Sequence, residues 1–98
     1  MKTIDVYQCE LGKTIPLEYV GRVRYFGESF GVDGLTDGKD YNLVKDETGY
    51  IKVVDDSEED YIYSLSNPAP ATGYSPGGIF KIVDDPREIL KKRGLPEL

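Results

Sequence analysis

The stretch that most constrains the fold runs from Tyr50 to Ser64 and reads YIKVVDDSEEDYIYS. Its first part alternates apolar and polar side chains, with Ile51 and Val53 on one side. Alternation with a period of two is typical of a strand that is buried on one face. Residues 56–59 are polar, as the tip of a hairpin should be, and Tyr61–Tyr63 is rich in residues that favour strands. The stretch therefore predicts a β-hairpin.

The rest of the chain predicts further short strands separated by turn residues. Aromatic and β-branched side chains dominate these candidates, and Gly and Pro lie between them. Gly21 lies inside one candidate and indicates a bulge or a tight bend there. Together with the hairpin, the pattern predicts a small all-β barrel of about five to six strands. The further candidate strands are Thr3–Leu11, Glu18–Phe26, Lys39–Lys45 and Phe80–Val83.

A helix signal follows the last candidate strand. Asp85 is suited to cap a helix, and Glu88 stands at the spacing of a capping box. The signal predicts a short C-terminal helix over about 86–93, too short to be stable alone. We therefore expect Ile89 and Leu90 to dock on the barrel.

A chain of 98 residues fits a single domain with one modest core. We expect that domain to span 1–98, with the barrel over about 18–85. The single cysteine, Cys9, excludes an internal disulfide, and we expect it to be a small buried side chain. The predicted core consists of Val20, Val23, Leu35, Tyr41, Val44, Ile51, Val53, Ile62, Phe80 and Ile82.

Parts of the sequence resemble a known group of proteins. Gly34–Val44 (GLTDGKDYNLV), the Tyr50–Ser64 stretch and Phe80–Asp85 (FKIVDD) are similar to small uncharacterised bacterial and phage-borne proteins with an SH3-like barrel. The resemblance covers about Glu18 to Asp85, and the Pro- and Gly-rich segment 67–78 is longer than the connection in that pattern. The resemblance implies an SH3-like barrel and no known activity, because a fold alone does not set a function.

Composition excludes several kinds of chemistry. The chain has no histidine and one cysteine, which removes His-dependent triads and zinc sites built from His or Cys. No register of the acidic run from Asp55 or Asp56 has the Gly and Glu positions of an EF-hand loop. Carboxylates at a polar turn are normally solvated, whereas acid–base catalysis needs one of them desolvated. We therefore expect no enzyme activity, no metal site and no cofactor.

Charge points to a protein partner. The net charge is −6, and the segment from Asp37 to Asp60 carries nine acids against three lysines, which accounts for all of it. Direct nucleic-acid binding needs a basic patch, so we do not expect it.

No apolar run approaches the roughly 18 residues of a membrane span, and no signal peptide is visible, so we expect a cytoplasmic protein.

We hypothesise a non-enzymatic module that binds another protein with a basic or Pro-rich surface. Its eight tyrosines cannot all be deeply buried in so small a barrel, and an aromatic groove beside acidic loops suits such partners. The alternative is an acidic anti-defence or regulatory protein of a mobile element that inhibits a nucleic-acid enzyme by charge mimicry. The oligomeric state stays open. The candidate binding residues are Asp55, Asp56, Glu58, Glu59, Asp60, Tyr61, Tyr63 and Tyr74.

Overall fold

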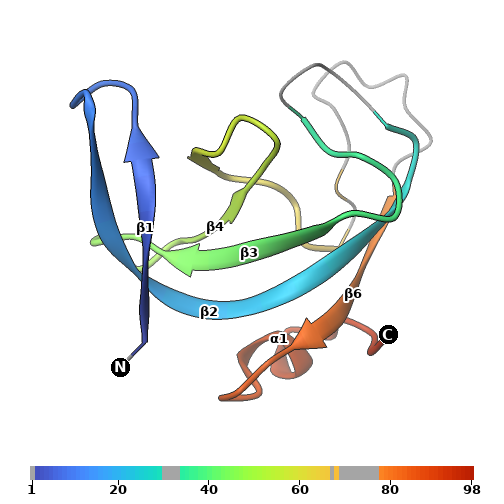
Figure 1. The fold of residues 1–98 in the computed structure, drawn as a ribbon. Coiled ribbons are helices and arrows are strands. Elements are labelled where there is room, and N and C mark those ends of the chain that lie inside the picture. Colours follow the sequence, from blue (N-terminus) through green and yellow to red (C-terminus); the bar gives the residue numbers. More distant parts are fainter. Residues whose placement is uncertain (1, 30–33, 67, 69–77) are drawn as a thin grey trace.

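The computed structural model describes residues 2–29, 34–66, 68 and 78–98. Within them the chain forms one curled antiparallel sheet and a short C-terminal helix (Figure 1). The elements are β1 (Thr3–Gln8), β2 (Lys13–Gly27), β3 (Asp40–Lys45), β4 (Ile51–Val54), β5 (Asp60–Tyr61), β6 (Gly78–Asp84) and α1 (Ile89–Lys92). Strands β1 to β5 follow one another across the sheet, and β6 returns to pair with β2. This confirms the predicted all-β, barrel-like fold with a short C-terminal helix.

The long strand β2 organises the sheet. It pairs with β1 through its first half, with β6 through its second half and with β3 in between (Figure 1). The predicted bulge is present, because the register with β3 shifts between Tyr19 and Gly21. A Cβ atom on Gly21 would lie 2.5 Å from the Asp84 carbonyl oxygen and 2.8 Å from Leu90 Cδ1. Glycine at this position therefore lets β6 and α1 approach β2 closely.

Most of the predicted core is buried as expected. Of the ten predicted residues, only Ile62 is wrong, because its side chain is 68% exposed. The returning strand is shorter than predicted: β5 ends at Tyr61, and Tyr63 rather than Ile62 packs against the core. Because Ile62 and Tyr63 lie beyond the end of the strand, strand alternation does not decide which of them faces inward. Further buried apolar residues are Val6, Leu17, Tyr19, Tyr25, Leu43, Leu90 and Leu95.

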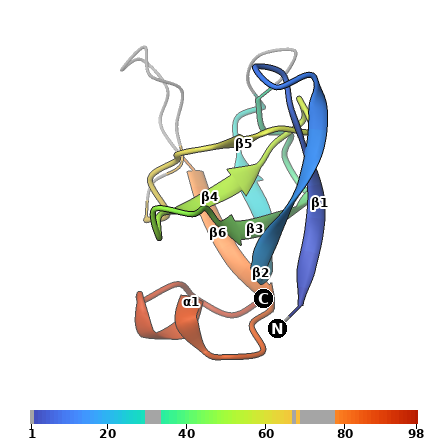
Figure 2. The same ribbon diagram turned by 90° about the vertical axis from the view of Figure 1, so that its left-hand side faces the viewer.

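The C-terminal helix begins later than its sequence signal. It starts at Ile89 rather than near 86, because Glu88 adopts a left-handed conformation with φ 57°. Asp85 still caps the helix, but its carboxylate accepts hydrogen bonds from the backbone N–H groups of Leu90 and Lys91. Leu90 is fully buried and Ile89 packs against the core, as predicted. Figure 2 shows α1 lying below the curled sheet.

The chain after α1 also pairs with the sheet. The Ile82 N–H donates to the Pro96 carbonyl oxygen, and the Leu98 N–H donates to the Ile82 carbonyl oxygen. This short parallel bridge fastens the C-terminal segment along the outer edge of β6. Leu95 is buried in the core at the start of that segment. The turn that follows α1 is therefore held in place from both ends.

Candidate functional site

The predicted acidic site begins with Asp55, which the structure places inside the molecule. Its side chain is only 6% exposed. Among the described residues, no other charged side chain is buried. One carboxylate oxygen accepts hydrogen bonds from the Ser57 N–H and hydroxyl, and the other accepts one from the Tyr63 hydroxyl at 2.7 Å. A buried carboxylate held by three donors organises the hairpin turn and is not available to a partner.

Asp56 holds a different part of the chain. It accepts hydrogen bonds from Lys39 Nζ at 2.6 Å, from the Thr36 hydroxyl at 2.8 Å and from the Tyr41 hydroxyl at 2.9 Å. Burial alone would raise the pKa of Asp56, but these three donors outweigh it and hold the pKa below its ordinary value. Asp56 therefore anchors the segment before β3 to the hairpin.

The end of the acidic run contacts the turn between β1 and β2. Asp60 accepts a hydrogen bond from Gln8 Nε2 at 2.8 Å and lies 3.7 Å from Lys52 Nζ. Glu59 accepts a hydrogen bond from the Cys9 N–H at 2.8 Å. Cys9 itself is exposed, so the expectation of a buried cysteine is wrong. Of the five acids predicted to bind, only Glu58 is exposed.

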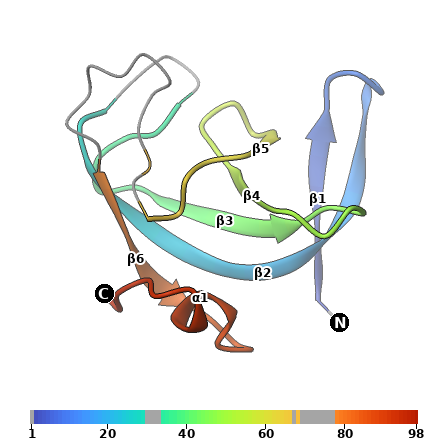
Figure 3. The same cartoon turned by 180° about the vertical axis from the view of Figure 1, so that it is seen from behind.

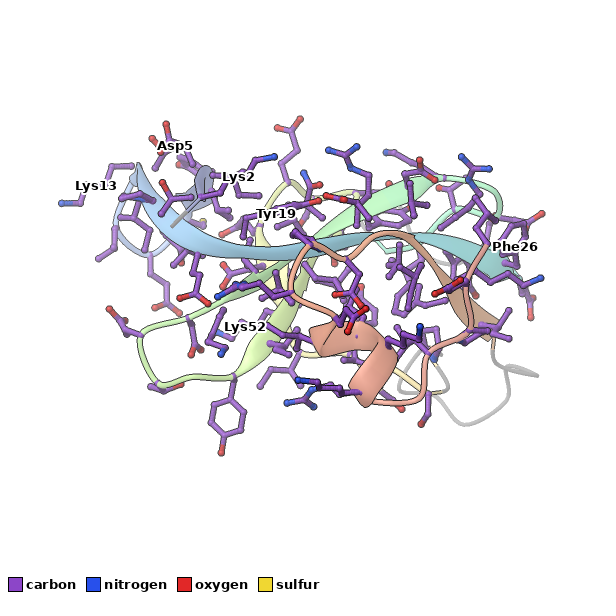
Figure 4. The ribbon with its side chains drawn as sticks, turned by 90° about the horizontal axis from the view of Figure 1, so that it is seen from below. Lys2, Asp5, Lys13, Tyr19, Phe26 and Lys52 are labelled. Atoms are coloured by element: carbon purple, nitrogen blue, oxygen red, sulfur yellow. The ribbon has the colours of Figure 1, made fainter. Side chains whose placement is uncertain are left out.

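The predicted tyrosines do not form one surface. The Tyr63 side chain is half-buried, and burial together with the Asp55 carboxylate raises the pKa of its hydroxyl. Tyr61 is exposed on β5, and Tyr74 lies outside the described residues. The buried tyrosines each donate a hydrogen bond from their hydroxyl. Tyr19 donates to the Asp84 carboxylate, Tyr25 to the Glu28 carbonyl oxygen and Tyr41 to the Asp56 carboxylate. Lys2 lies over the ring of Tyr19, and Figure 4 labels both.

The structure instead reveals a groove beside the hairpin, lined by both apolar and polar side chains. Its volume is about 570 Å³, within the range of ligand pockets. Tyr50 and Ile62 are 64% and 68% exposed and line it. The other lining residues are Gly49, Ile51, Tyr63, Leu65, Ser66 and Arg93. We call this the main groove.

A second hollow continues the main groove along the C-terminal turn. It has a volume of about 250 Å³ and shares Leu65, Ser66 and Arg93 with the main groove. Its other walls are formed by Ile79 and Phe80 of β6 and by residues 94–96. Figure 3 shows the segment after β5 running towards β6, with α1 below it. We call this part the side groove.

Local contacts fix the two walls of the main groove. Asp46 accepts hydrogen bonds from the Thr48 hydroxyl at 2.6 Å and from the Tyr50 N–H at 3.0 Å, which sets the β3–β4 turn. These bonds, led by that of Thr48, lower the pKa of Asp46 to about 2. On the opposite wall, Tyr63 and Leu65 pack against the core. Tyr50 and Ile62 are thus held on ordered backbone although their side chains face water.

Sequence reasoning missed this groove for an identifiable reason. The sequence pattern places Ile62 in the core and so does not predict its exposure beside Tyr50. The predicted helix over about 86–93 ends at Arg93, and the sequence does not link that residue to a groove. No pattern within a single strand links residues 49–51, 62–66 and 93, which the fold alone brings together.

Within the described residues, no group of three or more Cys, Asp or Glu side chains is arranged to hold a metal ion. In the same part of the chain, no helix has the length and apolar character needed to cross a membrane.

Comparison of the chain with protein-family models, with curated proteins and with solved structures finds no match. The resemblance to SH3-like phage-borne proteins therefore stays a prediction.

Proposed function

We propose that this chain is a non-enzymatic module that binds another protein, and that the main groove is its binding surface. The observation that carries the proposal is the exposure of Ile62 next to Tyr50 in a formed hollow. Apolar side chains that gather in an exposed hollow mark sites of interaction more strongly than isolated ones. Tyrosine is also enriched among the residues that contribute most to protein interfaces.

Burial of these side chains supplies the driving force. Removing apolar surface from water contributes about 25 cal/mol per Å², so covering Tyr50 and Ile62 is worth on the order of 1–2 kcal/mol each. Both lie on backbone that is already ordered, so binding costs little conformational entropy on this side. A short peptide segment is the partner that a groove of this size accommodates.

The structure gives less support to the acidic run as the binding surface. Four of its five acids accept hydrogen bonds from within the chain: Asp55, Asp56, Glu59 and Asp60. A basic partner would have to compete with those donors. Charge mimicry, the alternative hypothesis, needs a face of free carboxylates, and no observation favours it over the groove.

Selection from a displayed library of short random peptides tests the proposal. Immobilised wild-type protein should enrich apolar peptides, and Ile62→Ser should abolish their binding. Leu11→Ser is the matched control, because Leu11 is 58% exposed and lies outside the groove. Circular dichroism of both variants shows that the fold is retained. Equal binding to Ile62→Ser, or enrichment of no peptide at all, would contradict the proposal.

A further inference from the structure

We propose that the peptide in the groove carries an acidic side chain, Asp or Glu, near its middle, and that Arg93 binds it. This inference rests on the proposed function and names the chemistry of the partner. It differs from the basic partner that the acidic composition suggested. It is carried by the position of Arg93, by its lack of an ion-pair partner and by the charges around it.

Arg93 lies where the two parts of the groove meet. It lines the main groove and the side groove together with Leu65 and Ser66. Tyr50 and Ile62 are apolar surface on one side of this junction, and Ile79, which is 40% exposed, is apolar surface on the other. A peptide that covers both parts therefore passes Arg93 with apolar residues on each side.

The guanidinium of Arg93 is available for such a contact. Among the described residues, no carboxylate forms an ion pair with it. Nearby Lys91 does form an ion pair, because its Nζ atom lies 3.8 Å from a carboxylate oxygen of Glu97. Arg93 is exposed, so a bound carboxylate could reach it.

The charges of the groove point the same way. Of the described residues that line either part, Arg93 is the charged one, and no acid is present. The chain as a whole has a net charge of −6, so an acidic peptide would be repelled from most other surfaces. An arginine guanidinium binds a carboxylate through paired hydrogen bonds, which favours one register of the peptide.

The geometry selects a side-chain carboxylate over the end of a chain. A terminal carboxylate at Arg93 would leave one part of the groove empty, because the peptide would stop at the junction. An internal Asp or Glu lets both parts be filled. We therefore expect apolar residues before and after the acid.

The experiment uses peptides displayed with a blocked C-terminus and selected on the full-length protein. Enriched sequences should carry an Asp or Glu between apolar residues. The affinity of one enriched peptide and of its amide counterpart, with Asn or Gln in place of the acid, is then measured by fluorescence polarisation. On wild-type protein the amide should bind about fivefold more weakly, which is the upper end for an exposed ion pair.

Two variants separate a local contact from net charge. Arg93→Gln should bind both peptides equally, whereas Lys92→Gln should keep the fivefold preference, because Lys92 is exposed and outside the groove. The preference should also shrink as salt is raised. Enriched peptides without an acid, or a preference that survives in Arg93→Gln, would overturn this inference but leave the main groove as the proposed binding surface. Binding only by peptides with a free C-terminus would overturn the choice of a side chain. Enrichment of no peptide would overturn the proposed function as well.

Discussion

Replacing Asp55 with alanine should strongly destabilise the fold. The change removes the acceptor of three hydrogen bonds, from the Ser57 N–H, the Ser57 hydroxyl and the Tyr63 hydroxyl. A buried donor that loses its acceptor costs about 1–3 kcal/mol. We assign about 1.5 kcal/mol to the Tyr63 donor and about half of that to each of the two Ser57 donors. The expected loss in the free energy of unfolding is therefore about 3 kcal/mol.

Urea denaturation followed by far-UV circular dichroism measures this loss. The chain has no tryptophan, so backbone dichroism is the better signal. A loss of this size lowers the melting temperature of so small a domain by about 15 °C. Tyr63→Phe is a milder variant. It should lower the free energy of unfolding by about 1.5 kcal/mol, because it removes one hydrogen bond to a charged acceptor.

The control is Glu58→Gln, in the same turn. Glu58 is exposed, so the change should alter stability by less than about 0.5 kcal/mol. If Asp55→Ala lost no more than this control, the carboxylate would not be held inside the hairpin. The acidic run would then again be a candidate binding surface, and the reasoning that moved the site to the groove would fail.

Two further predictions concern the long strand β2. Gly21→Ala should destabilise the protein by about 2 kcal/mol in thermal unfolding, because the new Cβ would meet the Asp84 carbonyl oxygen and Leu90; an unchanged melting temperature would contradict the close approach. Burial first, and then the Asp84 carboxylate, raise the pKa of Tyr19 from 10.0 to about 12. The stability that this hydroxyl contributes is present below about pH 10 and is lost as the pH rises towards 12. Tyr19→Phe should flatten that decline, and an equal decline in both proteins would exclude Tyr19 as its source.

The fold was largely predictable because its signals are local. The alternation of Ile51 and Val53 and the bulge glycine Gly21 each act through neighbouring residues. Both features are found in the structure at the expected places. The capping signal predicts too early a start for the helix, because the left-handed backbone at Glu88 has no clear signature in its side chain.

The candidate site was much less predictable, for a physical reason. The returning strand offers Ile62 and Tyr63 as alternatives for the inner face, and hydrophobicity favours Ile62. The hydrogen bond from the Tyr63 hydroxyl to buried Asp55 accompanies the opposite choice. That pairing depends on the turn geometry around Ser57, which strand periodicity does not encode. The groove also needs Arg93, which only the docking of α1 brings near.

The most direct test of the account maps a bound peptide onto the protein. A library-selected peptide is titrated into protein labelled with nitrogen-15, and the amide signals are followed by NMR. We predict that the largest changes lie in residues 49–51, 62–66 and 93–95, around the main groove and the side groove. Changes confined to the acidic run 55–60, with the groove signals unmoved, would contradict the claim that the groove is the binding surface.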